Sequence, residues 1–167
     1  SDNRPVIRRA EGDQFLLITQ HDHALIAGEL AERFGNAEFA PPQPRESAIL
    51  GVRLHDCGWP KHDEAPTVNG RGQPLDVFET PREIALAVWT AGAEKAAAAD
   101  PYAGLLVSLH VLSLSVFATT QTAFEHEKFD IQQPADRFAV AKFQQREIER
   151  QEKLRTQLGL RTDKPAH

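Results

Sequence analysis

Cysteine, basic charge and long apolar runs are all scarce in this chain, and each scarcity excludes a class of protein. The 167 residues include one cysteine, Cys57, so no internal disulfide can form and nothing calls for an oxidising compartment. Lys and Arg number 19 against 24 Asp and Glu, and the resulting net charge of -5 gives no basic surface for nucleic acid or an anionic membrane. We therefore expect a cytoplasmic protein with neither of those partners.

One apolar segment is long enough to be considered as a membrane span. Residues 103–118 read AGLLVSLHVLSLSVFA, but the run is shorter than the roughly 20 residues that a bilayer requires. It also carries His110 and three serines, which are costly in lipid. We expect a buried helix in a single globular domain, because 41% of the residues are hydrophobic and 26% are charged.

The only strong β signal lies at the start of the chain. Residues 6–9 and 15–19 are β-prone runs on either side of a turn that contains Gly12, which predicts a hairpin within residues 1–19. From Asp22 the apolar period becomes helical, and we expect a helical core over residues 20–159 followed by a short tail, 160–167. The predicted fold class is all-α, a bundle of about five to six helices with a small N-terminal β-hairpin.

Start and stop signals set the expected helix boundaries. The first helix carries Ile26, Ala27, Leu30 and Phe34 at helical spacing and ends at Gly35. Cap and proline signals place the other expected helices at 46–57, 80–99 with Thr80 as cap, 101 toward 124 with Asp100 as cap, and 136–158. Between them, residues 59–80 form a long loop, and its apolar residues predict an ordered segment that lies over the core.

Three of the seven histidines are the unusual feature of the helical region. His23, His55 and His110 each share a helix face with apolar neighbours, so each is expected to point inward. A single inward histidine is more often a hydrogen-bonded core residue than a ligand. Three of them on separate helices indicate a metal site, because ligands from facing helices converge in bundle cores. Asp56, next to His55, adds a carboxylate ligand suited to a first-row divalent ion: manganese, iron, cobalt, nickel or zinc.

The arrangement of His23 and the later pair His55–Asp56, each in a helical context and the pair at a helix end, resembles the HD-domain pattern. In that fold such residues and a later aspartate hold one or two divalent ions. The segments ITQHDHALIAGELAERFG, GVRLHDCGWPKHDEAP, GQPLDVFETP and LLVSLHVLSL also resemble a bacterial family known as domain of unknown function 3891. The matching positions are Gln20, Asp22, His23, His55, Asp56, Gly58, Trp59, Asp63, Pro66 and His110.

The resemblance implies roles for these positions. His23, His55, Asp56 and His110 are expected to hold the metal, while Gln20 and Asp22 are expected to contact substrate. Trp59 is a further candidate for stacking on a planar ligand, although tryptophan beside a loop is more often a packing anchor.

The chain departs from the HD pattern at the closing aspartate. Asp130 lies near the break before Pro134, and Asp136 has the position of a helix cap. His110 or Asp63 could replace the missing ligand. Asp63 is also our candidate general base, against the alternative of a solvated acidic turn.

These patterns predict a metal-dependent hydrolase that acts on a small phosphorylated or nucleotide-like molecule. The alternative is a degenerate HD-like module that binds a small molecule or a metal without turnover. A third possibility makes the long charged C-terminal helix a surface for homo-oligomer formation. Cys57 as a nucleophile is a weaker hypothesis, since a small buried residue is more common at such a helix end.

Overall fold

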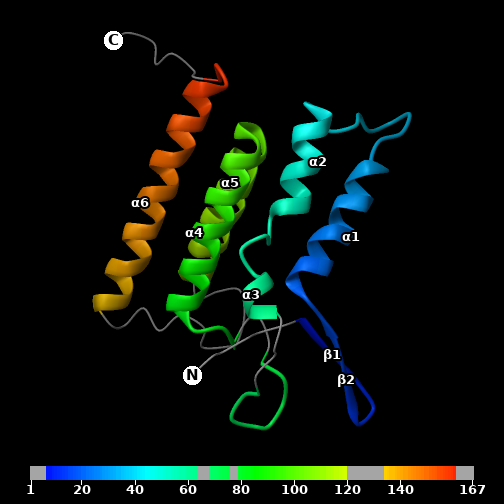
Figure 1. Ribbon diagram of the computed structural model, residues 1–167, viewed down its shortest axis with the longest axis vertical. Helices are drawn as coiled ribbons and strands as arrows, with labels where there is room; N and C mark the ends of the chain where they lie inside the picture. Colours follow the sequence, from blue (N-terminus) through cyan, green and yellow to red (C-terminus); the bar gives the residue numbers. More distant parts are fainter. Residues whose placement is uncertain (1–6, 64–67, 76–78, 120–133, 161–167) are drawn as a thin grey trace.

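The computed structural model shows a helical bundle with a two-stranded hairpin at one end (Figure 1). It describes residues 7–63, 68–75, 79–119 and 134–160, except for the side chains of residues 62, 63 and 117–119. The helices stand roughly side by side, with α6 (Pro134–Gln157) at one edge, the pair α4 (Arg82–Ala99) and α5 (Pro101–Thr119) next to it, then α2 (Arg45–Leu54), and α1 (Gln20–Glu32) at the other edge. The predicted all-α class with an N-terminal hairpin is confirmed.

The hairpin consists of β1 (Ile7–Glu11) and β2 (Gln14–Ile18), which pair antiparallel. Ile7 lies opposite Ile18 at the open end, and the turn uses Gly12 at a φ of 64°, a left-handed conformation that glycine adopts without strain. The prediction of a hairpin in this segment is confirmed. Its second strand leads directly into the first helix.

Helix α1 (Gln20–Glu32) begins where Thr19 caps it, since the Thr19 hydroxyl accepts a hydrogen bond from the Asp22 amide at 3.0 Å. Its buried residues are Gln20, Ala24 and Gly28, which lie four residues apart and face α2. The predicted inward face was wrong: Ile26 and Leu30 on α1, and Phe34 just beyond it, are 57%, 67% and 56% exposed. His23 is exposed as well.

Small residues explain why the buried face of α1 differs from the predicted one. The Cβ of an alanine at position 28 would lie 2.1 Å from Cγ of Arg53 on α2, so Gly28 lets that side chain cross α1 closely. Arg53 then reaches Glu32 at the end of α1, with an N···O distance of 2.6 Å. The close face of α1 is therefore the one with small side chains, and the large apolar residues point away.

Helix α2 (Arg45–Leu54) ends three residues before the predicted boundary, so His55 is its C-cap and Asp56 lies in the turn that follows. A short helix, α3 (Pro60–Asp63), comes next, in the segment that we expected to be loop. Of the large apolar residues in the predicted loop, from which we expected an ordered segment over the core, Trp59 and Leu75 are buried and Val68 is 64% exposed, while Val77 and Phe78 lie outside the described residues.

Helices α4 (Arg82–Ala99) and α5 (Pro101–Thr119) form a tight antiparallel pair around Asp100, which caps α5 by accepting the Ala103 amide at 2.8 Å. That cap is confirmed. Thr80 is not the cap of α4, because Pro81 occupies the cap position and the helix begins one residue later than expected. Residues 120–124, where we expected α5 to continue, lie outside the described residues.

Helix α6 (Pro134–Gln157) packs along α5 and completes the core. Phe143 is fully buried against Val107 and Val111 of α5 and Leu86 of α4. Gly159, with a φ of 67°, follows its end as predicted. In the part of the chain that the structure describes, no helix is both long and apolar enough to cross a membrane.

Candidate metal centre

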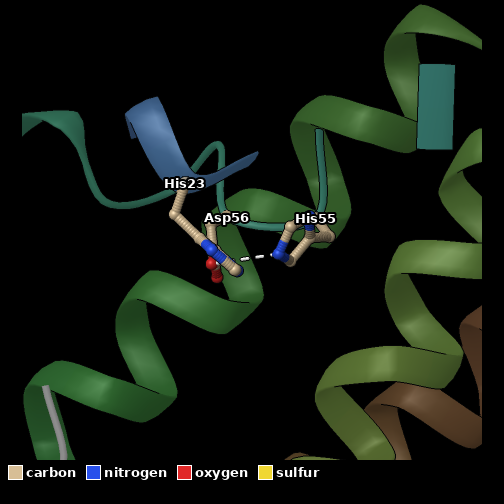
Figure 2. A group of neighbouring side chains, drawn as sticks. All are labelled: His23, His55 and Asp56. Carbon is tan, nitrogen blue, oxygen red and sulfur yellow. Dashed lines mark ion pairs between the residues drawn. The ribbon is translucent and has the colours of Figure 1, made fainter. Parts of the chain in front are cut away.

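His23, His55 and Asp56 converge at one end of the bundle, beside the hairpin and α3 (Figures 1 and 2). Each offers one ligand atom, and these atoms all lie within 4.8 Å of one another. His23 comes from the first turn of α1, while His55 and Asp56 come from the end of α2. The packing of α1 on α2 therefore joins residues that are far apart in the sequence.

Hydrogen bonds orient the His55 ring. Its Nδ1 lies 2.6 Å from the Val52 carbonyl oxygen, and a carbonyl can only accept, so Nδ1 carries the proton and donates it. The other nitrogen, Nε2, lies 3.2 Å from Oδ2 of Asp56 (Figure 2). A backbone carbonyl that holds one nitrogen while the other faces a carboxylate is the usual setting of a metal-binding histidine.

The same contacts determine how His55 titrates. Burial alone lowers the pKa of His55, but the hydrogen bonds to Asp56 and to the Val52 carbonyl, with the Asp56 charge, raise it above its ordinary value. Asp56 is only 8% exposed, so its carboxylate makes little contact with solvent water. A cation at this position would replace the proton that Nε2 and Asp56 share.

His110 lies on the inner side of the cluster. Its ring centroid is 5.1 Å from that of His55, the same separation as between His55 and His23, and both ring pairs meet edge to face. Burial, and then the neighbouring His55, lower the pKa of His110, so this ring is the more readily neutral of the two. Among the described residues, the group within 4.8 Å comprises His23, His55 and Asp56, and His110 adjoins it through His55.

Glycine allows the turn after the His-Asp pair to lie against α4. A Cβ at Gly58 would come within 2.2 Å of the Val88 carbonyl oxygen and 3.1 Å of the Gly92 amide nitrogen. Cys57, next in the same turn, is buried and donates from Sγ to the Gly92 carbonyl at 3.4 Å. Burial raises the pKa of the Cys57 thiol, which opposes a role as a nucleophile.

The residues that we expected to contact substrate have different surroundings. Gln20 lies one turn before His23 and is 4% exposed, and its Nε2 is a buried donor with no hydrogen-bond partner in the part of the chain that the structure describes. Asp22 is exposed, and Trp59 is 2% exposed, which leaves little ring surface for a ligand. The backbone of Asp63 closes α3 near α1, but its side chain, like those of His62 and Glu64, lies outside the described residues.

One candidate for the missing HD aspartate is already paired. Oδ2 of Asp136 lies 2.5 Å from Nη1 of Arg82, so this carboxylate links the start of α6 to the start of α4. Asp130 lies outside the described residues. Among those described, the cluster therefore has one carboxylate, that of Asp56.

Two features of the site were not predicted from the sequence. The Val52 carbonyl that orients His55 is a backbone group, which leaves no signature in the residue type. Gly58 was named from the sequence only as a position that matches the family, although a glycine directly after His55, Asp56 and Cys57 is also a signal of close backbone approach.

A comparison with models of protein families gives a match over nearly the whole chain. The family model described as "Protein of unknown function (DUF3891)" matches residues 6–167. No curated protein and no solved structure is significantly similar to the chain.

Proposed function

Because the chain belongs to this family of unknown function, its activity has to be inferred from the site, and we propose a metal-dependent hydrolase of the HD-like type. Its substrate class is a small phosphorylated or nucleotide-like molecule. The observation that carries the proposal is the cluster of His23, His55 and Asp56, whose ligand atoms lie within 4.8 Å of one another.

The donor set fits a divalent first-row ion. Two imidazoles and a carboxylate suit manganese, iron, cobalt, nickel or zinc, and His110, whose ring adjoins that of His55, is our candidate for a fourth ligand or for a support of His55. The Val52 carbonyl fixes the His55 tautomer and so leaves Nε2 as the metal-binding nitrogen. A bound divalent ion would supply Lewis acidity toward a phosphoryl oxygen and would lower the pKa of water.

The protein residues supply position and proton transfer. His23 is exposed, so the cluster is accessible from the α1 side. Nε2 of Gln20, one turn away, is a buried donor without a hydrogen-bond partner among the described residues, and an oxygen of a substrate bound beside the cluster would satisfy it. Asp63 is our candidate general base, because α3 packs near the first helix. The buried thiol of Cys57 is compatible with a reducing cytoplasm, where we place the activity.

Turnover of generic phosphoesters with added manganese, cobalt or nickel tests the proposal. We expect hydrolysis that Asp56→Ala abolishes and that His21→Ala retains, since His21 is an exposed residue on the same turn as His23. Metal-dependent hydrolysis that survives both Asp56→Ala and His55→Ala would place the chemistry elsewhere.

A second candidate function is a binding module without turnover. The single carboxylate of the cluster and the pairing of Asp136 with Arg82 favour it, because hydrolysis in HD-like sites uses a further aspartate. This alternative predicts metal binding that His55→Ala removes, together with no hydrolysis of any phosphoester tested.

A further inference from the structure

The outer face of α1 carries large apolar side chains that no described element covers. Ile26, Leu30 and Phe34 are 57%, 67% and 56% exposed. They follow one another at intervals of four residues, so they form a single line, the α1 stripe, that continues past the helix end. Phe39, in the segment after the helix, is 58% exposed and adds to the apolar surface.

The position of α1 makes this exposure informative. The helix is at the edge of the bundle (Figure 1), and its small-residue face is the one that packs on α2. Contiguous apolar surface on a globular protein usually marks an interaction site, whereas scattered single residues do not. Helix α6 also exposes Phe138 and Ile148, but these lie ten residues apart and do not form such a line.

Charges beside the stripe indicate its partner. Glu29 and Arg33 lie on one flank, 65% and 73% exposed, with an N···O distance of 3.9 Å between them. When two helices pack antiparallel about a two-fold axis, the same flank of each faces its copy. With the axis close to Leu30, Glu29 of one copy lies opposite Arg33 of the other, and the reverse pair forms as well. The stripe is thus self-complementary in both apolar surface and charge.

We propose that α1 is the interface of a two-fold homodimer, in which the stripes of two copies pack antiparallel across Leu30. The dimer interface would also lie next to the metal centre, because His23 is on the same side of α1 as Ile26 and Leu30. Dimer formation does not require that the site be catalytic, so it can be tested independently of the proposed activity.

Sedimentation equilibrium of the full chain tests the interface. We expect a concentration-dependent dimer, and Leu30→Glu should raise its dissociation constant by at least about 10-fold, because a charge would enter the centre of the apolar contact. Leu30 is exposed in the single chain, so this change leaves its fold intact. Phe138→Glu is the matched control, an equally exposed apolar residue on α6, and it should leave the dimer unchanged.

A charge exchange gives a second, independent readout. Glu29→Arg alone brings like charges together across the interface and should weaken the dimer, and adding Arg33→Glu should restore it. A wild-type chain that stays monomeric at every concentration overturns the proposal, as does a monomer that binds phospholipid vesicles through the stripe. A dimer lost with Phe138→Glu and kept with Leu30→Glu would place the interface on α6 instead.

Discussion

At His55, burial opposes two hydrogen bonds and a neighbouring carboxylate, and the result is a raised pKa. In the metal-free protein we expect the His55 ring to titrate above its ordinary value of 6.5 and His110 to titrate below it. Asp56→Asn should lower the His55 midpoint, since it removes the charge that stabilises the imidazolium. NMR titration of the imidazole signals measures both midpoints. A His55 midpoint at or below the ordinary value would contradict the hydrogen bonding described above.

The raised pKa of His55 and the lowered pKa of His110 determine how the folding stability changes with pH. The stabilisation from protonated His55 is fully present below its unfolded pKa and is lost as pH rises through its raised folded pKa. Neutral His110 contributes stability that is lost as pH falls from its unfolded pKa toward its lowered folded one. Metal binding has the opposite dependence to His55 protonation, because Nε2 must lose its proton, so metal affinity should fall as His55 becomes protonated.

Glu147 of α6 takes no part in the proposed metal centre, but its side chain lies in the core between α5 and α6. It is fully buried, and its Oε2 accepts hydrogen bonds from the Ser108 hydroxyl at 2.8 Å and from Nε of Arg150 at 3.0 Å. Its Oε1 has no hydrogen-bond partner. We expect Glu147→Ala to lower the free energy of unfolding by about 3 kcal/mol, because it leaves polar partners unpaired in the core.

Urea unfolding measures that loss. The exposed neighbour Glu149 provides the control, and Glu149→Ala should change stability by less than about 0.5 kcal/mol. A loss for Glu147→Ala that is also below about 0.5 kcal/mol would show that the α5–α6 polar contacts contribute nothing to stability.

At the level of elements, the turn after α2 depends on close contact with α4. Gly58→Ala would place a methyl group 2.2 Å from the Val88 carbonyl oxygen, which is a backbone atom of α4 and cannot move independently of that helix. We expect a loss of about 1–3 kcal/mol in unfolding free energy and weaker metal binding, since the turn carries His55 and Asp56. Urea unfolding and metal titration measure the two effects.

Gly70 is the matched control for this substitution. A Cβ there meets nothing within 4 Å, and Gly70 is not among the glycines with positive φ. Gly70→Ala should therefore be tolerated in both measurements. If Gly58→Ala is tolerated equally well, the turn is not held against α4.

Element boundaries were predictable where local chemistry sets them, and packing faces were not. The hairpin around Gly12, the Asp100 cap and the end of α6 at Gly159 follow from conformational preferences that act over a few residues. The inward face of α1 was mispredicted because burial there is decided by how closely Arg53 can approach Gly28. Such a contact between helices distant in sequence is invisible to apolar periodicity, which counts large residues as the inward ones.

In the candidate site, too, some features were predictable from the sequence and others depend on packing. The convergence of His23 with His55 and Asp56 was expected, and the structure places these residues together. The exposure of His23 and the pairing of Asp136 with Arg82 were not foreseen, whereas the burial of Trp59 agrees with its interpretation as a packing anchor. The first two depend on which helices are neighbours in the bundle, and the sequence of one helix carries little information about that.

For the whole molecule, metal binding and folding should be coupled, because the ligands come from two helices that only the fold brings together. Manganese at about 100 times its dissociation constant should stabilise the protein by about 2.7 kcal/mol. For a chain of this length, that corresponds to a rise in Tm of roughly 5–10 °C. Differential scanning calorimetry measures the rise, which His55→Ala should abolish and His21→Ala should preserve.

Elemental analysis of protein purified without chelator tests whether His23, His55 and Asp56 hold a metal. We expect a first-row divalent metal in stoichiometric amount in the wild-type chain and in His21→Ala, and its loss from His55→Ala and Asp56→Ala. A wild-type chain without metal that also fails to bind added manganese would show that these residues form no metal centre, as would full metal content in both site variants.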